Sequence, residues 1–227
     1  MPEKALLSLI VLALLRPPAA PAASIPVVQY TEGASQAFAR YLAGLQSASA
    51  WTVESIEIEA ALPKLKKQGR LRAIRRITPL GEADYQVLES TGDATVRREV
   101  IARYLSSQAA AKEIPAASVA ITPANYEFRY QGVGKIGETL AYVFHIRPRK
   151  KRQGLMNGEL WLEGQTGTAI RQSGYLVKSP SMFLRRVEVT RDTVLSQGVA
   201  HMRLTHLSLD TRLVGLADLT VTERLLR

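Results

Sequence analysis

Residues that could carry out acid–base or metal chemistry are sparse in this 227-residue chain. The histidines are His145, His201 and His206, and no H-E-x-x-H or comparable metal-ligand spacing joins them to acidic residues. There is no cysteine, which excludes disulfides, thiol nucleophiles and zinc–thiolate sites. No serine stands in a G-x-S-x-G motif. We therefore predict no catalytic residue, no metal site, no cofactor and no enzymatic activity.

A glycine-rich motif, GVGKIG at residues 132–137, matches the G-x-G-x-x-G pattern of dinucleotide-binding loops. Such a site also needs a helix directly after the glycines and an acidic residue about 20 positions further on. The next residues, ETLAYVFHI, alternate as a strand does, and Asn157 stands where the acid should be. We interpret the motif as a glycine-rich hairpin turn.

A basic cluster holds five positive charges within six residues, namely Arg147, Arg149, Lys150, Lys151 and Arg152. Because Pro148 interrupts the run and Gly154 ends it, one interpretation is a solvated hairpin turn. The alternative is contact with an anionic membrane surface, where each charge contributes about 1 kcal/mol. Five such charges would hold the protein weakly and reversibly, which suits a shuttle better than an anchor.

The N-terminal residues indicate in which compartment the protein resides, and therefore which partners the basic cluster can contact. Lys4 precedes an apolar run from Ala5 to Leu15, and Ala20-Pro21-Ala22 offers a cleavage site, so residues 1–22 are predicted to be a signal peptide cleaved near Ala22. The run is shorter than the roughly 20 residues that span a bilayer. An uncleaved membrane anchor is the alternative, and Arg16 directly after the run favours it.

Export without cysteines favours a bacterial periplasm. Residues 23–227 have a formal net charge of +9, because residues 1–22 contain Glu3, Lys4 and Arg16. In that compartment anionic lipid head groups are abundant and nucleic acid is rare. We therefore expect a transient anionic membrane surface as a partner, and no nucleic acid.

Apolar spacing predicts two helices, at residues 32–47 and 94–114. Alternation of apolar and polar residues predicts nine or ten strands joined by short turns, which makes neighbouring strands antiparallel. A single sheet of this size curls, and its inner face must be covered. We predict one α+β domain over residues 23–227 in which a curled antiparallel sheet wraps the helices. We also expect the protein to be a monomer.

If side chains do not fill the inside of such a sheet, its apolar lumen can take an acyl chain, with about 0.8 kcal/mol gained per buried methylene. Core packing is the alternative role for the same side chains. The predicted ligand-binding wall consists of Ile56, Ile58, Tyr85, Val87, Phe128, Tyr130, Tyr142, Phe144, Leu160 and Leu162. The predicted helical cover consists of Phe38, Tyr41, Val100 and Tyr104.

Residues 142–171, YVFHIRPRKKRQGLMNGELWLEGQTGTAIR, resemble one segment of the periplasmic lipoprotein carrier superfamily, the LolA/LolB/RseB-like proteins. That segment reads as strand, I-x-P-K/R, turn, and then G-x-L-W-L/I-D/E-x-x-T-G. The matching residues are Ile146, Pro148, Arg149, Gly158, Leu160, Trp161, Leu162, Glu163, Thr166 and Gly167. The order of leader, first helix, strands, second helix and further strands is also similar.

The resemblance implies an unclosed antiparallel β-barrel that wraps two or three helices and a cavity that binds lipid acyl chains or lipoproteins without covalent chemistry. It implies that Thr166 and Gly167 form a structural turn. The expected function is a periplasmic carrier or binding protein, as in outer-membrane lipoprotein sorting. The chain lacks the lipidation cysteine of the receptor member. Two alternatives remain: a regulatory sensor that binds a partner protein, as the RseB branch does, and an enzyme of unrecognised type.

Overall fold

The computed structural model describes residues 31–47, 53–77, 83–111, 114–182, 184–212 and 215–226. The predicted signal peptide, residues 1–22, lies outside the described residues.

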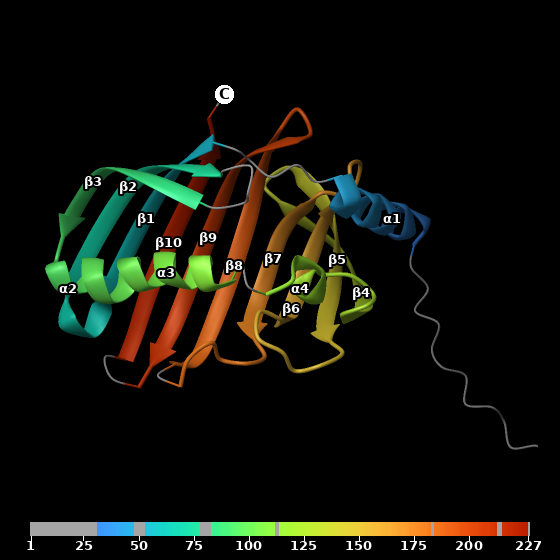
Figure 1. Ribbon diagram of the computed structural model, residues 1–227. Coiled ribbons are helices and arrows are strands. Elements are labelled where there is room, and N and C mark those ends of the chain that lie inside the picture. The colour runs from blue at the N-terminus through green and yellow to red at the C-terminus, as the bar shows by residue number, and fades with distance from the viewer. Residues whose placement is uncertain are drawn as a thin grey trace, which may run out of the picture.

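A single antiparallel sheet of ten strands, in the order β3-β2-β1-β10-β9-β8-β7-β6-β5-β4, dominates the fold (Figure 1). The edge strands β3 and β4 do not pair, so the sheet stays open and curls around the helices, which confirms the predicted fold class. The strands are β1 (Val53–Leu62), β2 (Lys67–Ile77), β3 (Ala83–Gly92), β4 (Tyr126–Ile136), β5 (Thr139–Pro148), β6 (Met156–Glu163), β7 (Ala169–Leu176), β8 (Leu184–Ser196), β9 (Val199–Thr211) and β10 (Gly215–Leu225).

The chain path explains this order. Strands β1 to β3 run outward to one edge, and a helical segment then carries the chain to the opposite edge at β4. From β4 each strand pairs with the next until β10 returns to β1, where Ile58 lies opposite Val221. The first and last strands of the domain therefore meet in the middle of the sheet.

The first helix, α1 (Glu32–Ser47), has the predicted bounds. The second predicted helix consists of α2 (Ala94–Val96), a π-helical turn (Arg97–Ile101) and α3 (Ala102–Ala111). Asp93 caps its start, because the Oδ1 atom accepts hydrogen bonds from the amides of Thr95 (2.8 Å) and Val96 (3.2 Å). A short helix, α4 (Ala116–Val119), was not expected from the sequence.

Helix α4 is held by the buried Asn125, whose amide donates hydrogen bonds to the carbonyl oxygens of Ala117 (2.8 Å) and Ala120 (2.9 Å). These bonds satisfy carbonyl groups at the end of a helix too short to hold itself.

The glycine-rich motif forms the predicted hairpin, but with a shorter turn. Strand β4 continues to Ile136, so only Gly137 and Glu138 lie between the strands. Gly134 lies within β4 against Trp161, and a Cβ atom there would be 2.5 Å from the indole ring. Its role is close packing, not phosphate binding.

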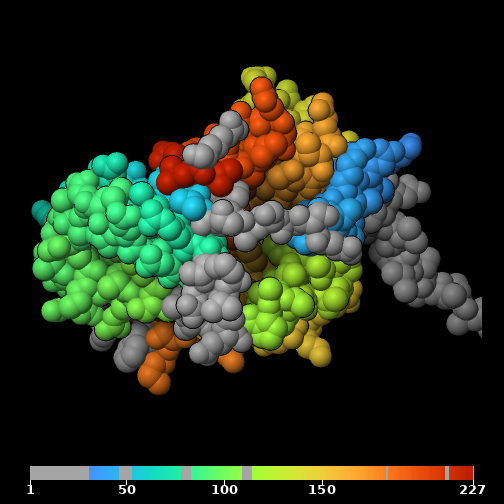
Figure 2. All heavy atoms as spheres, turned by 45° about the horizontal axis from the view of Figure 1, so that its top comes forward, coloured from blue at the N-terminus to red at the C-terminus, as the bar shows by residue number. Residues whose placement is uncertain are grey.

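The space-filling view places the α2–α3 segment and α1 on opposite sides of the molecule (Figure 2). The apolar side chains beneath these two helical elements form two separate clusters.

Candidate functional site on the inner face of the sheet

The inner face of the sheet is the face that the helices cover. Strand register places Ile58 of β1, Leu219 of β10, Leu207 of β9, Val189 of β8 and Phe144 of β5 on this face. Its apolar side chains gather at the two ends of the sheet, each under its own helical element.

The first cluster lies over β1, β2 and β10 beneath α2 and α3, and we call it the β1 cluster. The predicted stripe of the second helix points into it, since Val96 and Ile101 are buried and Tyr104 and Leu105 pack against them. The β1 cluster also contains Ile56, Ile58, Ala60, Leu62, Leu71, Ala73, Ala217, Leu219 and Val221, with Tyr85, Val100, Leu207 and Leu209 packed against its edge.

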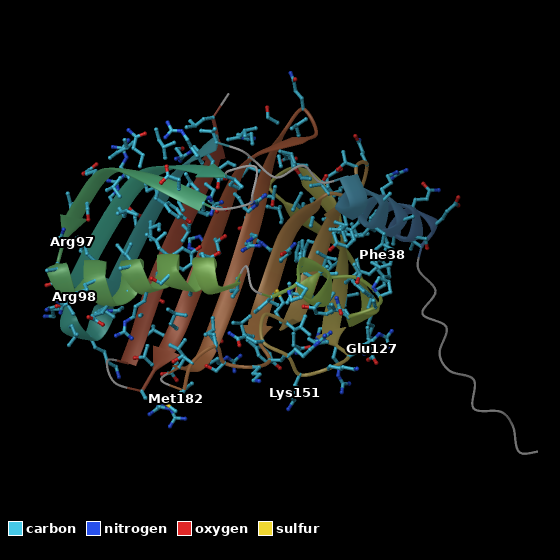
Figure 3. The ribbon with its side chains drawn as sticks, viewed as in Figure 1. Phe38, Arg97, Arg98, Glu127, Lys151 and Met182 are labelled. Carbon is cyan, nitrogen blue, oxygen red and sulfur yellow. The ribbon has the colours of Figure 1, made fainter. Side chains whose placement is uncertain are left out.

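The second cluster lies over β4 to β7 beneath α1 and α4, and we call it the aromatic cluster. Its buried residues are Ala34, Ala37, Tyr41, Tyr126, Phe144, Ile146, Leu155, Met156, Leu160 and Leu162. Phe38 of α1 lies between the helix and the sheet (Figure 3), with its ring centroid 4.8 Å from that of Phe128 and 5.4 Å from that of Phe144. Tyr130 continues the layer, 5.6 Å from Phe144 and 6.4 Å from Tyr142.

The predicted wall and cover residues differ in how far they remain accessible. Ile56, Ile58, Tyr41, Phe144, Leu160 and Leu162 are buried by the protein's own side chains. Phe38, Tyr85, Val100, Tyr104, Phe128, Tyr130 and Tyr142 are half-buried. Val87 lies on the edge strand β3 with 54% of its surface exposed. A ligand could therefore reach the half-buried set directly, and the buried set only if a helix moved.

Helix α1 is fastened to the aromatic cluster by few polar contacts. The Tyr41 hydroxyl donates to the carbonyl oxygen of Ile121 (3.0 Å), and the Arg40 guanidinium donates to the carbonyl oxygen of Gly164 (3.3 Å). Gly167 in the β6–β7 turn touches the helix so closely that a Cβ atom there would lie 2.5 Å from the Ala37 carbonyl oxygen. Burial raises the pKa of the Tyr41 hydroxyl well above its ordinary value.

The β6–β7 turn supports α1 from below. The Glu163 carboxylate accepts hydrogen bonds from the amides of Gln165 (3.0 Å) and Thr166 (2.6 Å). Partial burial opposes the charge, but these hydrogen bonds outweigh it and lower the pKa of Glu163. The turn on which α1 rests is thus shaped by Glu163, Thr166 and Gly167, three residues of the motif at residues 142–171.

Between the two clusters the inner face is mixed, because Val187 and Val189 of β8 are apolar whereas a neighbouring row is polar. One register row runs across the sheet from Leu160 through Gln172, Arg191 and Thr205 to Val221. Leu160 and Val221, at the ends, are buried, whereas Gln172 is half-buried and Arg191 is exposed. Nitrogen-tipped side chains are visible in front of these middle strands in Figure 3.

An ion-pair group occupies one end of this polar region. Arg75 pairs with the buried Glu54 and with Glu223 (2.8 Å), and Arg203 approaches Glu223 at 3.5 Å. Burial raises the pKa of Glu54 even though Arg75 attracts its charge. Burial and the nearby Glu223 raise the pKa of Tyr104, which reaches over this group from α3, to about 12.

We did not anticipate these charged inner-face residues from the sequence, although a signal exists. Glu54 is in phase with Ile56 and Ile58, and Glu223 is in phase with Leu219 and Val221. A charged residue at an inward position of an alternating strand marks a place where the apolar cover is interrupted.

The predicted basic cluster forms the end of β5 and the β5–β6 turn. Arg149 and Arg152 hold the α4 segment, donating to the Pro123 carbonyl oxygen (2.9 Å) and the Asn125 side-chain oxygen (3.1 Å). Arg147, Lys150 and Lys151 are exposed, and Lys151 points outward from the tip (Figure 3). The cluster is therefore part structural support and part exposed charge.

A second basic region lies at the same end of the sheet, around the β7–β8 connection (Figure 3). Lys178, Arg185 and Arg212 line an open depression of about 800 Å³ together with Ser179, Ser181, Met182 and Leu184. Met182 has 77% of its surface exposed at the tip. No acidic residue lines this depression in the part of the chain that the structure describes.

Within the described ranges, no group of three or more histidine, aspartate or glutamate side chains could hold a metal ion. His201 and His206 lie on the same strand, β9, and His206 is exposed with its Nδ1 atom 3.1 Å from the Thr220 hydroxyl. Among the helices that the structure describes, none combines the length and apolar character needed to cross a bilayer.

Comparisons with known proteins found similarity in solved structures only. No protein-family model matches the chain, and no curated protein matches it. The chain is similar to a LolA superfamily protein from Nitrosomonas europaea, at 10% identity over 85% of this chain and 93% of that chain, with a TM-score of 0.35. It is also similar to an outer membrane lipoprotein-sorting protein domain from Vibrio parahaemolyticus, at 10% identity over 85% and 88%, with a TM-score of 0.33.

A further similar structure is MucB, at 13% identity over 83% of this chain and 93% of that chain, with a TM-score of 0.29. One of these structures is a protein of the LolA superfamily, the group that residues 142–171 resemble. At these identities and TM-scores the likeness assigns this chain to no family, and its function has to be argued from its own inner face.

Proposed function

We propose that this chain is a periplasmic, non-catalytic binding protein that carries lipid acyl chains, alone or as part of a lipoprotein. The observation that carries the proposal is the half-buried aromatic layer of Phe38, Phe128, Tyr130 and Tyr142 on the inner face of an open, curled sheet. Apolar rings that are accessible on a concave face are suited to bind a flexible hydrocarbon.

Helix α1 would regulate access to the rest of the aromatic cluster. Among the described residues, its attachment includes the apolar contacts of Phe38, Tyr41 and their neighbours and the two hydrogen bonds to Ile121 and Gly164. About twelve buried methylenes would contribute roughly 10 kcal/mol before ordering costs. An acyl chain that replaced part of the contact between α1 and the sheet would return much of the free energy that moving the helix costs.

The basic loops would favour a bilayer as the place where cargo is exchanged. Lys150, Lys151 and Lys178 are exposed at one end of the sheet, and Met182 supplies an apolar tip between basic residues. Each exposed charge near an anionic surface contributes about 1 kcal/mol, so contact would be reversible. Reversible contact allows a carrier to leave the membrane with its cargo.

Displacement of a fluorescent fatty acid tests the proposal, with Phe38→Asp as the variant and Ala39→Asp as the control. Ala39 is exposed on the same helix, so its substitution adds the same charge without touching the aromatic layer. Because losing a buried aromatic contact costs about 1.5–3 kcal/mol, Phe38→Asp should weaken binding about tenfold to hundredfold. Equal affinities of two folded variants, or no binding by wild type, would refute the proposal.

A second candidate function is binding of a partner protein, and the edge strand β3 favours it. Val87 and Leu88 are 54% and 55% exposed on β3, which within the described ranges pairs with β2 alone. An exposed edge with apolar side chains is a template for an extended peptide. Native mass spectrometry of gently extracted protein separates the candidates, since co-purified lipid supports the carrier and a bound polypeptide supports the partner-binding protein.

A further inference from the structure

Five charged side chains share the inner face: Glu54, Arg75 and Glu223 on the strands of the β1 cluster, and Arg191 and Arg203 on β8 and β9 between the two apolar clusters. Two acids face three arginines, which leaves one positive charge in excess within this group. The ion pairs join Arg75 to both acids and Arg203 to Glu223. Arg191 has no acidic partner within ion-pair distance among the residues that the structure describes.

Arg191 stands at the middle of the inner face. Across the sheet it lies opposite Gln172 of β7 and Thr205 of β9, and its Nε atom donates a hydrogen bond to the Thr205 hydroxyl (3.3 Å). Along β8 the next inward residue is the half-buried Val189, which is paired with Leu207. The guanidinium therefore lies beside accessible apolar side chains while remaining exposed itself.

The surroundings disfavour an isolated positive charge at this position. Burial among protein atoms and the nearby Arg203 charge lower the pKa of the Arg191 guanidinium, and the Glu223 charge offsets this only in part, although arginine stays protonated near neutral pH. An anion bound here would offset that repulsion. A carboxylate or phosphate would also match the planar fork of donors that an arginine presents.

We propose that Arg191 anchors the anionic head group, a carboxylate or a phosphate, of an amphiphile whose hydrocarbon lies on the inner face and reaches the aromatic cluster. The inference rests on the proposed function and names the class of its ligand. Phe144 lies three strands from Arg191, about 14 Å at the usual spacing between strands. Leu160 and Gln172 stand directly between them, whereas the neighbouring inner-face row, from Ile146 to Val189, contains Gly158 and Gly174, which carry no side chain that would block a chain lying across the sheet.

Two ligands of equal chain length separate the head-group contact from hydrocarbon burial. We would measure the dissociation constants of palmitate and of hexadecanol by displacement of an uncharged fluorescent alkyl probe. A charge-assisted hydrogen bond predicts that wild type binds palmitate about tenfold to hundredfold more tightly than hexadecanol. Arg191→Gln should abolish this preference and leave hexadecanol binding within about threefold of wild type.

Arg186→Gln is the matched control, because Arg186 lies on the same strand, is exposed and contacts Glu188 and the ring of Tyr175 instead of the inner face. It should retain the full preference for palmitate. Arg191→Lys keeps the charge and should retain part of it. Circular dichroism verifies that each variant is folded, and the wild-type preference alone tests the inference if Arg191→Gln does not fold.

The outcomes distinguish the two proposals. Equal affinity of wild type for palmitate and hexadecanol, or a preference that survives Arg191→Gln, would overturn the role of Arg191 and leave acyl-chain binding intact. Failure of wild type to bind either ligand would overturn both. Lysophosphatidate and inorganic phosphate identify the source of the anion. Tighter binding of lysophosphatidate than of hexadecanol supports a lipid head group. If the protein binds inorganic phosphate and palmitate does not compete with it, the proposal of an amphiphilic ligand is overturned.

Discussion

Substitution of Gly167 by alanine is a direct perturbation of the contact between α1 and the sheet. The Gly167 backbone has φ +73°, a conformation that L-residues avoid. An added Cβ atom would lie 2.5 Å from the Ala37 carbonyl oxygen, 2.7 Å from the Arg40 Cβ atom and 2.8 Å from the Tyr41 amide nitrogen. Since two of these atoms belong to the helix backbone, the helix has to shift away from the β6–β7 turn.

The expected cost has two parts. The left-handed backbone conformation costs an alanine about 1–2 kcal/mol, and forcing an extra carbon into a packed contact costs about 1–3 kcal/mol. Gly167→Ala should therefore lower the free energy of unfolding by about 2–5 kcal/mol. Gly137→Ala is the control, because Gly137 has φ +57° and no atom lies within 4 Å of its added Cβ atom. The free energy of unfolding of that variant should fall only by the cost of the left-handed backbone conformation, about 1–2 kcal/mol.

Urea unfolding of both variants measures how much of the loss in the free energy of unfolding comes from the contact with α1. Stopped-flow mixing with a fluorescent fatty acid then measures how each substitution changes the association rate of the ligand. If α1 restricts access to the aromatic cluster, Gly167→Ala should accelerate association of the ligand and Gly137→Ala should not. Equal destabilisation by the two substitutions, with equal association rates, would show that α1 is not packed on this turn and is not the element that limits access.

Three further changes test other parts of the structure. Phe144→Ala, within the fully buried part of the aromatic cluster, should lower the free energy of unfolding by about 3–5 kcal/mol in a urea titration, and a cost below about 1 kcal/mol would contradict its burial. Because burial raises the pKa of Glu54, its ionisation opposes folding at neutral pH, and this cost disappears once the pH falls below the unfolded value of 4.5. Glu54→Gln should thus raise the melting temperature at neutral pH and leave it unchanged in acid, whereas equal effects at both pH values would refute the assignment. Replacing Lys150 and Lys151 by glutamine should weaken co-sedimentation with anionic vesicles about tenfold to thirtyfold at low salt, and unchanged binding would remove this turn from the membrane contact.

Local sequence patterns predicted the elements well because their causes are local. The apolar stripe that includes Ala34, Ala37 and Tyr41 gave the bounds of α1, and the alternation of Ile56, Ile58 and their neighbours matches the buried face of β1. The π-helical turn at Arg97–Ile101 escaped prediction, since its apolar stripe resembles that of an ordinary helix.

The candidate site was harder to predict because it depends on strand register across the whole sheet. The sequence indicates which residues of β8 point the same way, but not that Arg191 lies beside Thr205 or that Val221 meets Ile58. Those pairings join segments far apart in the chain. The arrangement of two apolar clusters with a polar row between them therefore appears only in the assembled sheet.

The central claim is that hydrocarbon from another molecule lies on the inner face of this sheet. Paramagnetic relaxation by a fatty acid that carries a nitroxide on its chain measures this directly, through the broadening of methyl resonances. The account predicts strong broadening of Val189 and Leu207, which are half-buried on the inner face, and little broadening of Leu204, which is on the opposite face of β9. Broadening that is equal on both faces, or absent at Val189 and Leu207, would contradict it.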